Sequence, residues 1–181
     1  LNHLMSVKST FSIGESLLKT KQIISRAKEL NYESVCLSET MSLSSMIEFT
    51  REANKQNIRP IVSTTLRIVN QPDYKGKDKI DQGMFYVKAL PINDQGIKDL
   101  YKILSKGNSE EYLLKKQPRI GFEELELLLE LGNTVITTGD INNIFTREDN
   151  LSLLSKLNSI KKDAQSIYIE LVTVNTPLFD A

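Results

Sequence analysis

Short apolar runs alternate with segments of helical periodicity along this chain. Five segments predict helices. Three have apolar residues at helical spacing: Ile23, Ile24, Ala27 and Leu30; Met46, Phe49 and Ala53; and Ile97, Leu100, Tyr101 and Leu104. The fourth is the segment 122–131, and the fifth carries leucines at 151, 154 and 157. The apolar runs between them predict strands at 34–37, 58–69, 84–92, 134–137 and 167–174. Such alternation predicts an α/β fold of about five or six mostly parallel strands, in a barrel-like or open sheet.

Several residues mark where these elements begin and end. Asn93-Asp94 is a helix start, whereas Gly107-Asn108 and Gly132 are helix stops. The polar segment 70–82, which contains a proline and a glycine, predicts a surface loop or hairpin connection. Thr146 and Asp149 resemble a capping box, ahead of a helix with leucines at 151, 154 and 157.

Composition narrows the classes of function. The 181 residues contain 23 basic and 23 acidic side chains, so the net charge is zero. A free-standing DNA-binding domain usually carries a basic excess, so charge alone does not indicate a nucleic-acid partner. No stretch approaches the roughly 18 apolar residues that span a bilayer, and no secretory signal pattern is present. We therefore expect a cytoplasmic protein without a membrane partner.

Cys36 is the single cysteine, so an internal disulfide is excluded. It lies between Val35 and Leu37 in an expected strand, where a cysteine is usually an inert buried side chain.

Short motifs follow one another in a distinctive order. They are Lys8-Ser9-Thr10-Phe11-Ser12, Ser38-Glu39-Thr40, Asn57-Ile58-Arg59-Pro60-Ile61-Val62, the segment 93–100, Pro118-Arg119-Ile120 and Thr137-Thr138-Gly139. In this order and spacing they resemble the PHP (polymerase and histidinol phosphatase) domain of the bacterial DNA polymerase III alpha subunit. The resemblance covers essentially the whole chain. It implies a single PHP-like domain over 1–181, N-terminal in a longer polymerase chain, with a distorted β/α barrel and a cleft at the C-terminal strand ends.

The same resemblance implies where metal-binding members hold their cations, and there this sequence departs. The corresponding positions are Ser6, Lys8, Glu39, Thr40, Thr65, Tyr86 and Asp140. A transition-metal cluster needs several nitrogen or sulfur ligands, and the chain offers one histidine and one cysteine in total. We therefore expect no metal, no cofactor and no catalytic residue in this chain, and Mg²⁺ only in the polymerase part of the parent protein.

Three functions follow from these expectations. The first is a non-catalytic, structural PHP domain of a DNA-directed DNA polymerase, a nucleotidyltransferase of chromosome replication. Its partners would be the remainder of the polymerase chain, replisome proteins, and DNA through the parent. The alternative is a metal-dependent PHP phosphoesterase or proofreading 3'-5' exonuclease, which the missing ligands disfavour. The third is an unrelated α/β enzyme, because fold alone does not fix function.

A few residues invite a functional interpretation. His3 is either a surviving ligand or, as we favour, a terminal strand residue without a partner. Glu39 and Asp140 form either a two-carboxylate Mg²⁺ site or an acid–base pair, or, as we favour, a polar remnant satisfied by Lys8, hydroxyls and water. Lys8 either neutralises Glu39 in place of the lost metal or points to solvent. The basic cluster 115–119 either contacts a DNA backbone or, more usually, is a solvated loop.

Overall fold

A curled sheet of seven strands lies at the centre of the protein. The computed structural model describes residues 2–69, 84–114, 116–139, 155 and 167–170. The strand order is β1-β2-β3-β4-β6-β7, and β5 pairs with β3 off this path. The strands are β1 His3–Val7, β2 Ser34–Thr40, β3 Arg59–Val69, β4 Phe85–Pro91, β5 Ile120–Gly121, β6 Thr134–Thr137 and β7 Ile167–Tyr168.

Strand direction follows the connections that the sequence predicts. The pairs β1–β2, β2–β3, β3–β5 and β6–β7 are parallel, whereas β4 runs antiparallel to both β3 and β6. An antiparallel pair suits the hairpin connection expected at 70–82, although that segment itself lies outside the described residues. The prediction of a mixed α/β fold with mostly parallel strands is confirmed.

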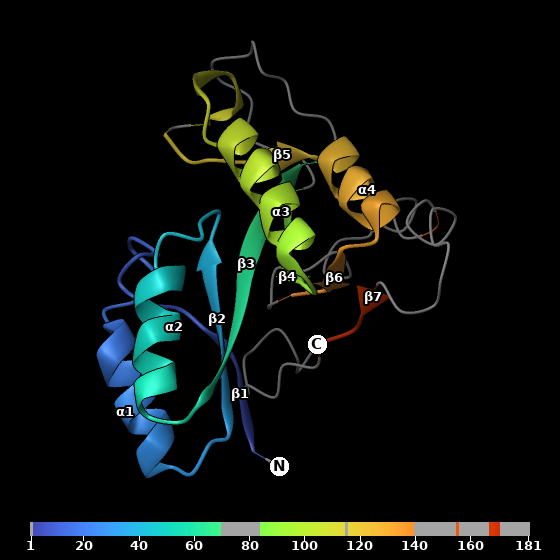
Figure 1. Ribbon diagram of the computed structural model, residues 1–181. Helices are drawn as coiled ribbons and strands as arrows, with labels where there is room; N and C mark the ends of the chain where they lie inside the picture. The colour runs from blue at the N-terminus through green and yellow to red at the C-terminus, as the bar shows by residue number, and fades with distance from the viewer. Residues whose placement is uncertain (1, 70–83, 115, 140–154, 156–166, 171–181) are drawn as a thin grey trace, which may run out of the picture.

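Within the described part of the chain, four α-helices cover one face of the sheet. They are α1 Thr20–Glu29, α2 Met46–Lys55, α3 Asp94–Gly107 and α4 Phe122–Leu131. Figure 1 shows α1 and α2 together over the first strands, and α3 and α4 over the later ones. The predicted cap of α3 is confirmed, since the Asn93 carboxamide oxygen accepts a hydrogen bond of 2.8 Å from the Gly96 N–H. Gly132 ends α4 with a left-handed φ of 68°.

Four predicted stripe positions are not part of the core: Leu30 and Tyr101 are exposed, and Met46 and Ile97 are half-buried outside both clusters. Leu30 is 48% exposed because it lies one residue beyond the end of α1. Tyr101 is 45% exposed because it lies at the edge of the buried stripe of α3, next to Leu100. The remaining stripes pack into two apolar clusters, one under α1 and α2 and the other under α3 and α4.

Some elements differ from the prediction or lie beyond the described residues. A 3₁₀ helix, Glu110–Tyr112, and the strand β5 are too short to produce a periodic signal. Because of β5, the described strands number seven, one more than the upper estimate. The helix expected around Leu154, its capping box, and residues 171–174 of the last predicted strand lie outside the described residues. No helix within the described ranges is long and apolar enough to cross a membrane.

Candidate functional site

The face of the sheet opposite the helices is polar, and we call it the inner polar face. Alternation along the strands places apolar residues toward the helices and polar residues on the other side. The inner polar face comprises Ser6 on β1, Cys36 and Ser38 on β2, Ser63, Thr65 and Arg67 on β3, Tyr86 and Lys88 on β4, and Thr137 on β6.

Hydrogen bonds join these side chains across neighbouring strands. Cys36 Sγ and Ser63 Oγ lie 3.3 Å apart, and Ser38 Oγ and Thr65 Oγ1 lie 2.9 Å apart. The Arg67 guanidinium donates to the Tyr86 hydroxyl at 3.3 Å, with its carbon 5.7 Å from the ring centroid. A row of hydroxyls with buried cations therefore lines the interior of the curled sheet.

The two edges of the sheet meet at this inner polar face. β1 and β7 are the end strands, and in a flat sheet their five inter-strand steps would separate them by roughly 24 Å. Instead, the Ser6 hydroxyl donates a 2.5 Å hydrogen bond to Glu170 Oε1, two residues after β7. The sheet therefore curls far enough for side chains from its first and last strands to touch.

Lys88 is at the centre of this contact. Its side chain is 5% exposed, and its ammonium donates to Ser6 Oγ and, at 2.5 Å, to Glu170 Oε1. The other carboxylate oxygen of Glu170 accepts from Thr137 Oγ1 at 3.0 Å, and the Glu170 N–H donates to Thr138 Oγ1 at 3.0 Å. Four strands or their ends thus contribute to one polar cluster.

The structure divides the predicted cleft positions into three places. Ser6, Thr65 and Tyr86 all lie on the inner polar face around Lys88, and Thr65 is the register partner of Lys88. Lys8 and Thr40 lie at the rim, where both bind Glu15. Glu39 lies elsewhere, and Asp140 is outside the described residues, so its expected nearness to Glu39 stays a prediction.

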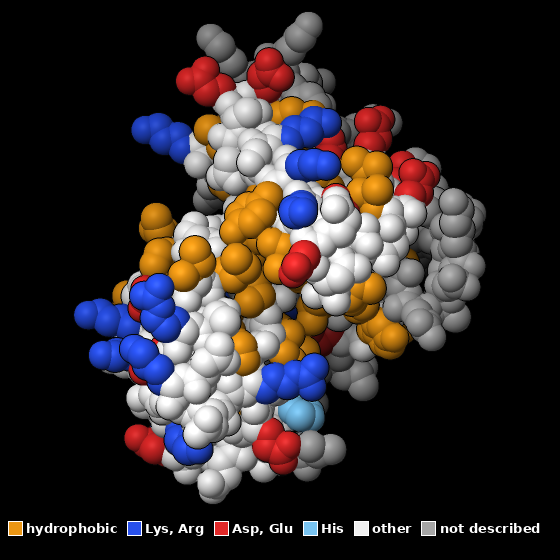
Figure 2. Space-filling model, in the orientation of Figure 1, with side chains coloured by type: hydrophobic (Ala, Val, Ile, Leu, Met, Phe, Trp, Pro, Cys, Tyr) orange, Lys and Arg blue, Asp and Glu red, His pale blue; other side chains and the backbone are white. Residues whose placement is uncertain are grey.

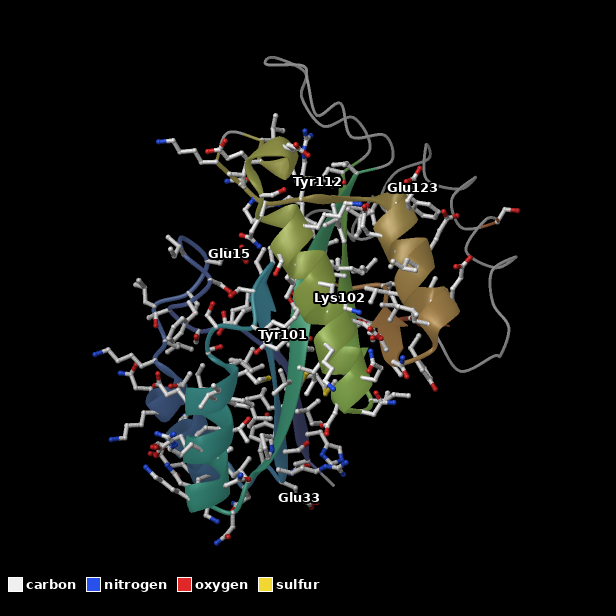
Figure 3. The ribbon with its side chains drawn as sticks, turned by 45° about the horizontal axis from the view of Figure 1, so that its top comes forward. Glu15, Glu33, Tyr101, Lys102, Tyr112 and Glu123 are labelled. Carbon is white, nitrogen blue, oxygen red and sulfur yellow. The ribbon has the colours of Figure 1, made fainter. Side chains whose placement is uncertain are left out.

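Lys8 does not neutralise Glu39, so that hypothesis is wrong. Its ammonium pairs with the Glu15 carboxylate, which also accepts a 2.8 Å hydrogen bond from Thr40 Oγ1. Glu15 lies on the loop after β1, near the end of β2 (Figure 3). The cause is side-chain direction, because alternation in β2 points Thr40 and Glu39 to opposite faces. The alternative, that Lys8 points freely to solvent, is also wrong, since its side chain is 22% exposed.

Glu39 is buried in a ring of serines. It is 1% exposed and accepts hydrogen bonds from the hydroxyls of Ser9 at 2.5 Å, of Ser12, and of Ser45 at 2.9 Å. The Ser9 N–H adds contacts of 3.2 and 3.3 Å. Ser9 and Ser12 belong to the loop after β1, and Ser45 directly precedes α2. Hydroxyls therefore satisfy this carboxylate, as the polar-remnant interpretation expects, but it does not face the inner polar face.

His3 and the basic cluster also differ from their predictions. His3 is exposed at the start of β1, and its Nδ1 lies 2.8 Å from Ser34 Oγ, so the expectation that it has no partner is wrong. Arg119 is 3% exposed, and its Nε donates to the Tyr112 carbonyl. It is buried because it directly precedes the short strand β5, which pairs with β3 in the core. The segment 115–119 is therefore not a uniformly solvated basic loop.

Burial raises the pKa of the Cys36 thiol, because desolvation disfavours the thiolate. Cys36 is 1% exposed, as the sequence predicted. We expect a thiol reagent such as 5,5'-dithiobis(2-nitrobenzoate) at pH 8 to label the folded chain at least about tenfold more slowly than the urea-unfolded chain. The unfolded chain should titrate as one thiol. Equal labelling rates in the two states would contradict the assignment of Cys36 to the closed interior.

Sequence reasoning missed Lys88 and Glu170, although a signal for Lys88 was present. The segment 84–92 was interpreted as apolar, yet its residues alternate, with Phe85, Val87 and Ala89 toward the core and Tyr86 and Lys88 opposite. A lysine in the middle of a strand that pairs on both sides must find a buried partner. The partner, Glu170, is more than eighty residues away in sequence, so only the curl of the sheet identifies it.

The donor set does not fit a transition-metal cluster. Among the described residues, the inner polar face offers hydroxyls, an ammonium, a guanidinium and one thiol, and Glu170 adds a carboxylate. Within the described ranges, no group of three or more histidine, cysteine, aspartate and glutamate side chains is placed to hold a metal ion. A charged lysine amine has no lone pair to donate to a cation.

An open hollow of about 680 Å³ lies between the loop after β1, the start of α2, α3 and residues 116–118, and its lining includes Thr40 at the rim and Arg67 of the inner polar face. Large apolar side chains around it are exposed: Ile13 by 93%, Ile47 by 66% and Tyr101 by 45%. Figure 2 shows hydrophobic side chains gathered on this face of the molecule. Such clustering is typical of a surface that contacts another protein surface.

Comparison with known proteins identifies the family. The sequence model of the PHP domain family matches residues 5–174, so this chain belongs to the PHP domain family. It is similar to the DNA polymerase III subunit alpha of Yersinia pestis, 25% identical over 165 residues that cover 84% of this chain and 14% of that protein. The subunit from Borreliella burgdorferi is 28% identical over 123 residues, which cover 67% of this chain and 10% of that protein. The chain therefore spans only a small part of these polymerase subunits.

A solved structure supports the fold. A crystal structure of a proposed metal-dependent phosphoesterase from Bifidobacterium adolescentis superposes with a TM-score of 0.58 at 11% identity, over 93% of this chain and 76% of that one. At this identity the likeness shows the fold alone. The expected β/α architecture of the PHP type is thus confirmed.

Proposed function

We propose that this chain is a non-catalytic, structural PHP domain of a DNA polymerase III alpha subunit that synthesises DNA in chromosome replication. One observation carries the proposal: the whole chain has a single histidine and a single cysteine, so it lacks the ligands of a PHP metal cluster. The side chains at the expected ligand positions support it, because Ser6 accepts from the Lys88 ammonium, Tyr86 accepts from the Arg67 guanidinium, and Thr65 is the register partner of Lys88.

The partner that fits best is the remainder of the polymerase chain. The matched region is 10–16% of the polymerase subunits it resembles, so most of each subunit lies outside it. The exposed apolar side chains around the hollow supply a surface for such packing. In this proposal, Mg²⁺ and the nucleotidyl-transfer chemistry belong to the polymerase part, DNA is bound through the parent protein, and the cell compartment is the cytoplasm.

Metal analysis and nuclease assays test the proposal. We expect the chain, purified without chelator, to contain well under about 0.1 transition-metal ion per molecule, because a stable PHP centre needs several nitrogen or sulfur ligands. We also expect no hydrolysis of single-stranded DNA or nitrophenyl phosphate above the buffer rate with Mn²⁺, Mg²⁺ or Zn²⁺. Stoichiometric zinc or manganese, or a hydrolysis that a chelator abolishes and added Mn²⁺ restores, would favour the phosphoesterase alternative.

A further inference from the structure

We infer that the Lys88 ammonium is a fixed internal cation that fastens the last strand of the sheet to the first, in the place where a bound ion would otherwise hold the interior together. The inference rests on the proposed function in one respect, that no metal occupies the interior. Otherwise it stands on the geometry of four side chains, Ser6, Lys88, Thr137 and Glu170.

Lys88 and Glu170 form a largely buried ion pair. The Lys88 side chain is 5% exposed and that of Glu170 is 22% exposed, so water screens their attraction only in part. A buried charge is costly unless it is paired and hydrogen-bonded, and each of these two charges has such partners. Lys88 donates to both Ser6 and Glu170, while Glu170 accepts from Ser6, Lys88 and Thr137. The two charges therefore hold each other in the interior.

The position of β7 in the sheet explains what the Lys88–Glu170 pair stabilises. β7 is a two-residue end strand, and parallel pairing with β6 is its only strand contact within the described residues. The backbone bond from the Thr138 N–H to the Tyr168 carbonyl, 2.9 Å, continues this pairing by one step. So short a strand has few ladder bonds of its own, and Glu170 ties its end to β4, β6 and β1 at once. Loss of the pair should therefore free β7 before it weakens β2 and β3.

The first test is a double-mutant cycle on this chain by urea unfolding. We expect Lys88→Met to raise the unfolding equilibrium constant about 100-fold or more, because it leaves Glu170 buried without its cation. Lys88→Met with Glu170→Gln should recover at least about tenfold of that loss. Lys8→Met is the matched control, since it breaks a lysine–glutamate pair at the rim whose side chains are more exposed than those of Lys88 and Glu170, and it should change the constant less than about fivefold.

The second test locates the effect and covers the case in which Lys88→Met does not fold. Glu170→Gln keeps the shape of the side chain and removes its charge. Native-state hydrogen exchange of this variant should show faster exchange at Thr138, whose N–H bonds to β7, than in wild type, with β2–β3 amides unchanged. Unchanged exchange at Thr138, or a cycle in which the two substitutions add without coupling, would overturn the inference.

Metal content measured on the same wild-type sample separates the two proposals. A metal-free chain without Lys88–Glu170 coupling refutes only the internal cation. Stoichiometric metal refutes the proposed function, and it also refutes the replacement of a bound ion by Lys88, whatever the coupling.

Discussion

Glu39→Ala is expected to lower the free energy of unfolding by about 3–5 kcal/mol, as measured by urea denaturation of this chain. The substitution removes a fully buried carboxylate. Its donors, the hydroxyls of Ser9, Ser12 and Ser45 and the Ser9 N–H, are then left without an acceptor. Each buried donor left without an acceptor costs about 1–3 kcal/mol, and the vacated volume adds a cavity term.

The chemistry of the serine ring explains why an acidic side chain is needed there. Ser12 Oγ accepts from the Thr40 N–H at 3.0 Å, and Ser9 Oγ accepts from the Phe11 N–H at 3.3 Å. Both hydroxyls therefore point their protons at Glu39, and an ionised carboxylate is a pure acceptor that suits them. In Glu39→Gln, the amide NH₂ would face one of these donors, so we expect a smaller loss of about 1–3 kcal/mol.

An exposed glutamate supplies the control for both variants. Glu29 pairs with Arg26 at 2.7 Å on the surface of α1, with its side chain 62% exposed. Glu29→Gln should change the free energy of unfolding by less than about 0.5 kcal/mol. If Glu39→Gln costs no more than Glu29→Gln, the ring of serines does not depend on the carboxylate and hydroxyl–hydroxyl or water contacts suffice.

Local pattern was enough to predict most of the fold. The helices at 122–131 and 94–107, and the strand at 134–137, were predicted to within a residue, because each has an apolar period together with a start or stop residue. Two-residue strands such as β5 have no period to detect. Their position depends on the neighbouring strand, here β3, and not on their own sequence.

The candidate site was harder to predict, for a reason visible in two glutamates. Sequence order placed Glu39 next to Thr40 in one expected cleft, but a strand sends neighbouring side chains to opposite faces. Glu170 carried no local signal, because its partners Ser6 and Lys88 meet it only when the sheet curls. The resemblance names the residues at the expected ligand positions, whereas the pairing of charges depends on long-range geometry.

Gly96 illustrates a motif residue whose physical reason emerges only in the fold. It belongs to the segment 93–100, one of the motifs by which the chain resembles its family, and its N–H completes the cap of α3. A Cβ at this position would lie 2.1 Å from the Asn133 carbonyl oxygen and 3.1 Å from Pro91 Cβ. The first turn of α3 therefore lies directly against the backbone that connects α4 to β6.

Gly96→Ala should consequently destabilise the chain, although alanine in place of glycine usually favours a helix by about 1 kcal/mol. Backbone cannot yield as a flexible side chain does, so we expect a loss of about 2–3 kcal/mol in urea unfolding. Gly107→Ala in the same helix is the matched control. Its added Cβ would lie 2.8 Å from Ile120 Cγ2 and Met41 Cε, and its nearest backbone atom, the Arg119 carbonyl oxygen, would be 3.1 Å away. We expect a smaller loss than for Gly96→Ala, because that backbone contact is 3.1 Å and not 2.1 Å, and because Met41 Cε ends a flexible side chain. Equal stability of the two variants would show that α3 does not approach the Asn133 backbone as closely as the structure places it.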